Sequence, residues 1–104
     1  MAKNFINFDK LEELSKKERV NLDEKIIKLF EEGGELAQAI LAYKGCPTAS
    51  ASGNADDILQ ECCDVMNVVL DIVNFMEFTS EEAEAMFNKK LNKWESKQNA
   101  LSSN

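Results

Sequence analysis

Glu31-Glu32-Gly33-Gly34-Glu35-Leu36 is an acidic stretch around which the rest of the chain is organised, and a related stretch, Glu61-Cys62-Cys63-Asp64, follows it along the chain. Both lie within segments whose apolar residues recur at helical spacing, so we expect each to sit on a helix. Residues three or four apart share a face of a helix. Glu32 and Glu35 therefore point the same way, and the two acidic residues of the second stretch do so too. Carboxylates crowded between packed helices need a partner, and a hard cation such as Mg²⁺ would provide it.

Together the two acidic motifs resemble those of the MazG-like all-α nucleoside triphosphate pyrophosphohydrolases. That family carries Glu-x-x-Glu, often with a further Glu before it, and Glu-x-x-Asp a few tens of residues later. Here Glu31-Glu32-x-x-Glu35 precedes Glu61-x-x-Asp64, with twenty-five residues between Glu35 and Glu61. The resemblance covers residues 20 to 98 or so. It implies an all-α, four-helix bundle-like MazG-type fold with a dimeric core.

The resemblance further implies Mg²⁺-dependent cleavage of a nucleoside triphosphate between its α- and β-phosphates, which releases the monophosphate and pyrophosphate. Mn²⁺ is an alternative cation. The metal would neutralise phosphate oxygens and the charge that develops during reaction. The implied metal ligands are Glu32, Glu35, Glu61 and Asp64. A carboxylate that is not fully committed to metal would orient the attacking water; Glu31 is the first candidate and Glu35 the second.

The last helix is expected over about 80–98, where Thr79 and Glu82 form a capping box. Its apolar residues should face the core, and lysines fill its second half. Lysines near a helix C-terminus are favourable in themselves, which is the simpler interpretation for Lys97. The family resemblance implies instead that a lysine here holds the triphosphate, with a further contact one turn later. The candidate substrate-binding residues are Lys89, Lys90, Asn92, Lys93 and Trp94.

Three helices are expected before this one. The first, over about 9–19, would be capped by Asp9 and lie at the periphery. The second would be capped by Asn21 and run to about Tyr43. The Gly33-Gly34 pair in its middle indicates close approach of another helix, either for packing alone or to bring the second carboxylate pair to the metal. Residues 44–55, rich in small and polar side chains, are expected to form a loop.

The third helix, over about 56–76, is the most apolar segment, and its breadth of apolar residues predicts burial on most sides. A polar stripe nevertheless runs along it. No lysine occurs between Lys44 and Lys89, so this stripe lacks the usual composition of a solvated face, and we interpret it as lining a site rather than facing solvent. The stripe consists of Glu61, Asp64, Asn67, Asp71 and Asn74.

Composition limits the other possibilities. A chain of 104 residues fits a single domain over 1–104, with a core small enough that a homodimer or tetramer is expected. The net charge of −7 disfavours a long nucleic acid as partner, and we expect no signal peptide and no membrane span. Three cysteines without a CxxC motif disfavour a zinc site and favour a reducing, cytoplasmic location.

Two alternatives and one open assignment remain. A di-iron carboxylate bundle is the disfavoured alternative, because it ordinarily needs Glu-x-x-His on two helices and the chain has no histidine. A non-catalytic helical regulatory or interaction module would keep the fold, with its acidic stripes solvated or facing a partner. If a nucleotide base is stacked on an aromatic ring, the candidates are Phe5, Phe8, Tyr43 and Trp94, each of which also fits a role in packing.

Overall fold

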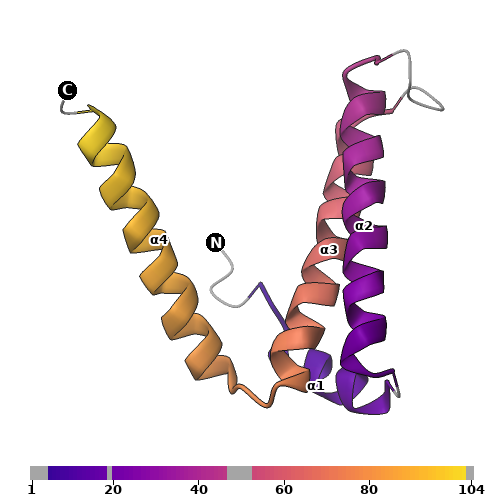
Figure 1. The fold of residues 1–104 in the computed structure, drawn as a ribbon, viewed down its shortest axis with the longest axis vertical. Helices are drawn as coiled ribbons and strands as arrows, with labels where there is room; N and C mark the ends of the chain where they lie inside the picture. The colour runs from indigo at the N-terminus through magenta and orange to yellow at the C-terminus, as the bar shows by residue number, and fades with distance from the viewer. Residues whose placement is uncertain (1–4, 19, 47–52, 103–104) are drawn as a thin grey trace.

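Four helices and no strands make up the part of the chain that the computed structural model describes, residues 5–18, 20–46 and 53–102. The all-α class predicted from the sequence is therefore confirmed. Helices α2 and α3 lie antiparallel and side by side, α1 packs against α3 near the end of this hairpin, and α4 leans away from it (Figure 1). The helices are α1 (Phe8–Lys17), α2 (Leu22–Tyr43), α3 (Ala55–Phe75) and α4 (Ser80–Ser102).

The N-termini of the first two helices are capped by asparagine side chains. Oδ1 of Asn21 accepts a hydrogen bond from the backbone N–H of Glu24 at 2.9 Å, which confirms the predicted cap of α2. The prediction that Asp9 caps α1 is wrong. Asn7 is the cap, and its Oδ1 accepts from the N–H of Lys10 at 3.1 Å. Asp9 lies in the first turn instead, where a carboxylate interacts favourably with the helix dipole.

Reciprocal capping boxes begin the last two helices. In α4, the N–H of Glu82 donates to the Thr79 hydroxyl at 3.1 Å, and the N–H of Thr79 donates to the Glu82 carboxylate at 3.0 Å, as predicted. In α3, Asn54 and Asp57 form the same arrangement, with both bonds at 3.0 Å. Each box satisfies backbone donors that the first turn of a helix leaves free, so both helices have well-defined starts.

The C-termini of α2 and α3 share a second motif, in which one residue adopts positive φ. Gly45 has φ of 73° after α2, and Glu77 has φ of 65° after α3. The next backbone N–H then reaches back by five residues, from Cys46 to the carbonyl of Leu41 at 3.0 Å and from Phe78 to that of Val73 at 3.3 Å. This is the Schellman pattern, which favours glycine at the left-handed position, so Glu77 carries strain that Gly45 does not.

The core of the described chain is small. Val68 on α3 is the one hydrophobic side chain that is buried there. The prediction that α3 is buried on most sides is wrong for a single chain, because α2 and α1 cover only part of its surface and Leu59 remains 60% exposed. The predicted core side of α4 is likewise exposed, since no residue of α4 is buried. Its exposed large apolar residues are Met86, Phe87, Leu91, Trp94 and Leu101.

Helix α2 has a second apolar face that points away from α3. Phe30 on that face is 79% exposed. A Cβ atom added to Gly33 or Gly34 would meet nothing within 4 Å, so both glycines border open space. The predicted close approach of a helix at this glycine pair is therefore wrong within one chain.

The expected loop at 44–55 is only partly visible. Residues 44–46 and 53–54 lie outside the helices, as expected, whereas 47–52 fall outside the described residues. Residues 1–4 likewise fall outside the described residues. Within the described ranges, no helix combines the length and hydrophobicity needed to cross a membrane.

Candidate metal centre

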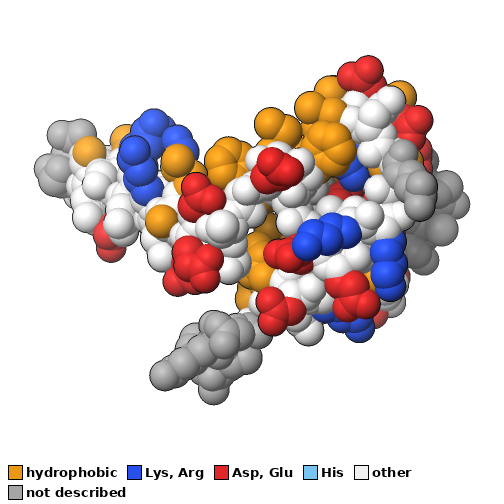
Figure 2. All heavy atoms as spheres, turned by 90° about the horizontal axis from the view of Figure 1, so that it is seen from below, with side chains coloured by type: hydrophobic (Ala, Val, Ile, Leu, Met, Phe, Trp, Pro, Cys, Tyr) orange, Lys and Arg blue, Asp and Glu red, His pale blue; other side chains and the backbone are white. Residues whose placement is uncertain are grey.

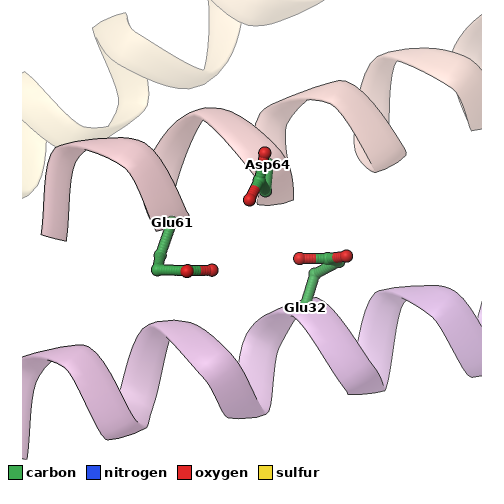
Figure 3. A group of neighbouring side chains, drawn as sticks. All are labelled: Glu32, Glu61 and Asp64. Atoms are coloured by element: carbon green, nitrogen blue, oxygen red, sulfur yellow. The ribbon is translucent and has the colours of Figure 1, made fainter. Parts of the chain in front are cut away.

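Three carboxylates from two helices converge between α2 and α3. One oxygen from each of Glu32, Glu61 and Asp64 lies within 4.8 Å of the others. Figure 3 shows Glu32 extending from α2 toward the two side chains of α3. The packing of the two helices explains this convergence, because Glu32 lies on the side of α2 that faces α3, and Glu61 and Asp64 lie on the side of α3 that faces α2. The helix pair thus brings together three of the four carboxylates predicted as metal ligands.

Two of these carboxylates carry buried oxygen atoms without a hydrogen-bond partner. They are Oε2 of Glu32 and Oε2 of Glu61. The Glu32 side chain is only 12% exposed. A buried polar atom with no partner is costly and rare in folded proteins. The arrangement fits a bound divalent cation, because Mg²⁺ takes carboxylate oxygens as ligands.

The electrostatic surroundings of Glu32 favour its neutral form. Burial raises the pKa of this carboxyl above its ordinary value, and the hydrogen bond and negative charge of Glu35 raise it further, as does the charge of Asp64. Lys28 opposes the shift, since its Nζ lies 3.9 Å from Oε1 of Glu32. A divalent cation would reverse this balance, because it stabilises the carboxylate form.

The other two glutamates of the first motif lie at the edge of the cluster. Glu35 is exposed and outside the group of three, although its interaction with Glu32 places it beside that group. Glu31 is exposed and faces a groove next to the cluster. Their positions leave both carboxylates accessible to water and to a ligand that approaches from solvent.

The groove has a volume of about 750 Å³ and lies between α1, α2 and α3. The groove lies next to the carboxylates. Its lining includes Asn67, one helical turn after Asp64, and Lys28, one turn before Glu32. Aliphatic side chains of all three helices form much of its wall, a composition typical of small-molecule sites. Among the candidates for base stacking, Phe8, Tyr43 and Trp94 are absent from its lining, as is Phe5.

A buried ion pair that sequence reasoning missed lies farther along the same helix pair. Nζ of Lys25 lies 2.5 Å from Oδ2 of Asp71 and 5.2 Å from the centre of the Phe75 ring. The hydroxyl of Ser15 on α1 donates to the other oxygen of Asp71. Asp71 belongs to the predicted polar stripe, and Lys25 lies four residues before Leu29 and seven before Glu32. That spacing on the inner face of α2 is the signal that could have identified the pair.

The polar stripe of α3 is therefore a set of inward and groove-lining contacts rather than one uniform face. Glu61 and Asp64 join the carboxylate cluster, Asn67 and Asp71 line the groove, and the Asn74 amide donates to the backbone carbonyl of Glu12 at 3.5 Å. The stripe thus serves both the candidate site and the attachment of α1.

The predicted substrate-binding residues of α4 are not brought to the cluster within one chain. All are exposed, and α4 diverges from the hairpin that holds the carboxylates (Figure 1). Trp94 is 61% exposed. The group comprises Lys89, Lys90, Asn92, Lys93 and Trp94.

Comparison with known proteins adds no relative: no family model, no curated protein and no solved structure matches this chain.

Proposed function

We propose that this protein is a Mg²⁺-dependent nucleoside triphosphate pyrophosphohydrolase of the MazG-like type, which converts a nucleoside triphosphate to the monophosphate and pyrophosphate. The observation that carries the proposal is the convergence of Glu32, Glu61 and Asp64 with two buried, unpartnered oxygens. The two acidic motifs and the all-helical fold agree with it.

In this proposal the chain's own residues divide the work between metal, water and substrate. Glu32, Glu61 and Asp64, with Glu35 beside them, would hold Mg²⁺, which when bound supplies charge neutralisation at the phosphates. Glu31 accepts a hydrogen bond from the attacking water and orients it toward the α-phosphorus. The new bond joins water oxygen to that phosphorus while Glu31 takes a proton from the water, the bond to the bridging oxygen breaks, and pyrophosphate leaves. The adjacent groove has room for the nucleoside.

Product analysis tests the reaction directly. A panel of nucleoside triphosphates is incubated with the protein, with and without Mg²⁺, and the products are separated by chromatography. We expect monophosphate and pyrophosphate in equal amounts and only with the cation. A diphosphate with orthophosphate would contradict the proposed cleavage position. An absence of turnover on every nucleotide would instead favour the non-catalytic helical module.

Substitution of Glu35 tests whether the carboxylates act on one cation. Glu35→Gln keeps the shape and removes a charge, so it should raise the metal-free Tm, reduce the Mg²⁺-induced shift in Tm and abolish turnover. For the parent, saturation to ten times Kd should stabilise the fold by about 1.4 kcal/mol, or roughly 4–8 °C. Glu13→Gln on the solvent face of α1 is the matched control. Unchanged melting of Glu35→Gln with and without Mg²⁺ would contradict a shared metal site.

A homodimer, or a tetramer built from it, is part of this proposal. The small core and the exposed apolar residues of α2 and α4 support association of several copies.

A further inference from the structure

Among the described residues, three lysines line the groove, and two of them are already engaged by carboxylates outside the cluster. Nζ of Lys25 is buried and lies 2.5 Å from Oδ2 of Asp71. Lys17 lies on α1, where its Nζ is 3.4 Å from Oε1 of Glu13 on the same helix. Neither Asp71 nor Glu13 belongs to the group of three carboxylates. A cation bound at that group would therefore leave both ion pairs in place.

The third lysine, Lys28, has a partner that is part of the cluster. Its Nζ lies 3.9 Å from Oε1 of Glu32, which is too far for a hydrogen bond, and its side chain is 60% exposed. The two residues are four apart on α2, so they share a face of the helix. An ion pair with an exposed lysine at this distance contributes little to stability. Lys28 is therefore held loosely at the point where the groove meets the cluster.

The groove is not otherwise suited to an anionic ligand. Its lining carries four acidic residues, which repel phosphates: Glu18, Glu24, Glu31 and Asp71. Figure 2 shows acidic and basic side chains interspersed at the end of the molecule that α1 forms, whereas lysines gather on part of the arm that α4 forms. That arm diverges from the hairpin that holds the cluster (Figure 1). Within one chain, Lys28 is thus the loosely held lysine that lies beside both the cluster and the groove.

We propose that Lys28 exchanges partners during binding, from Glu32 in the metal-free protein to a phosphate of the ligand once Glu32 holds the cation. This inference rests on the metal centre and the phosphate ligand of the proposed function. A Glu32 carboxylate that is committed to a cation no longer neutralises Lys28, and the new positive charge repels the ammonium. The lysine stem is flexible, so its ammonium turns into the groove and donates to phosphate oxygens. Lys28 thereby makes phosphate binding depend on prior occupation of the cluster.

The exchange predicts opposite effects of one substitution on two affinities. Calorimetry measures the first by titrating Mg²⁺ alone into the parent and into Lys28→Met. Lys28→Met should bind Mg²⁺ roughly two- to fivefold more tightly at low salt, because a repelling and competing charge is gone. The second titration adds inorganic tripolyphosphate, the phosphate chain common to nucleoside triphosphates, in saturating Mg²⁺. Here Lys28→Met should bind at least tenfold more weakly than the parent.

Lys17→Met is the matched control. It removes a lysine of the same groove that also pairs with a glutamate four residues away, but at a distance from the cluster. Both affinities should stay at the parental value. Lys28→Arg keeps the positive charge and should retain the binding of tripolyphosphate. Circular dichroism should show the same helicity for all three variants, since both lysines are exposed.

Parental tripolyphosphate affinity in Lys28→Met overturns the exchange and leaves the metal centre standing. Equal losses in Lys17→Met and Lys28→Met overturn it as well, because they would reflect the overall charge of the groove. Weaker Mg²⁺ binding by Lys28→Met does the same, since the lysine would then support the cation rather than compete with it. A parent that does not bind Mg²⁺ overturns the exchange together with the metal centre. None of these titrations requires turnover, so chromatography of nucleotide products reports separately on the proposed reaction.

Discussion

Lys25 and Asp71 form an ion pair across α2 and α3, with Nζ and Oδ2 2.5 Å apart and the lysine side chain only 2% exposed. The other oxygen of Asp71 accepts from Ser15, so one carboxylate joins three helices. This contact and the one from Asn74 to Glu12 attach α1 to the hairpin. The pair therefore sets the position of the helix that forms one wall of the groove.

Removal of the lysine should be strongly destabilising. Lys25→Met leaves Asp71 without its cation in a partly buried position, and we expect a loss of about 3 kcal/mol in the free energy of unfolding. The double variant Lys25→Met/Asp71→Leu should regain most of that loss, because no unpaired charge remains. Urea denaturation measures both, with Lys16→Met on the exposed face of α1 as control. A single variant as stable as the parent would show that the pair does not hold the helices together.

The raised pKa of Glu32 predicts a pH dependence of stability. Because the folded chain keeps this proton to higher pH than the unfolded chain, the free energy of unfolding should fall as pH rises from near the ordinary value of 4.5 through the raised pKa. Glu32→Gln should reduce this fall and stabilise the metal-free protein at neutral pH. Urea denaturation across that range measures it, with Glu13→Gln as control. Equal pH profiles for parent and Glu32→Gln would contradict the assigned environment.

The two Schellman caps predict opposite effects of glycine exchange. Glu77 adopts φ of 65° where glycine is favoured, so Glu77→Gly should stabilise the protein by about 1 kcal/mol. Gly45, at φ of 73°, should lose about the same amount on replacement by alanine. Thermal and urea unfolding of the two variants measure both values. Destabilisation by Glu77→Gly would mean that the Glu77 side chain has a stabilising role of its own.

The lysines of α4 predict a kinetic effect if the proposed function holds. Replacing Lys89, Lys90 or Lys93 by alanine should reduce kcat/KM, with at least one loss of tenfold or more, about 1.4 kcal/mol. The physical reason is loss of a cation that holds the phosphates of the substrate. Steady-state assays with Lys16→Ala as control measure it. Unchanged kcat/KM in all three variants would remove this helix from the site.

Local signals allowed much of the fold to be predicted from the sequence. The capping residues Asn21 and Thr79 are correct because a cap depends only on side chains within one turn. The convergence of Glu32 with Glu61 and Asp64 was also predictable, since helical spacing orients each motif. Asp9 was misassigned because Asn7, two residues earlier, competes for the same helix start.

Burial was not predictable in the same way. The apolar breadth of α3 and the apolar stripe of α4 are typical of helices that face a core, yet a sequence does not say whether a face is covered by its own chain or by another. The Gly33-Gly34 pair predicts close approach of a helix. Both glycines border open space in a single chain, so a second copy would have to supply that helix. Lys25 was missed because a lysine that follows Asp23 and Glu24 near the start of a helix usually extends to solvent, and only the position of Asp71 shows its partner.

The absence of buried residues in α4 has a consequence for how the chain folds. A lone helix of 23 residues gains little from its own hydrogen bonds in water, where even good helix formers of about 12–15 residues are marginal. The α2–α3 hairpin should therefore form first and α4 should fluctuate between coil and helix until packing stabilises it. If copies associate as proposed, far-ultraviolet circular dichroism should lose amplitude on dilution, and a protease should cut within α4 before it cuts the hairpin.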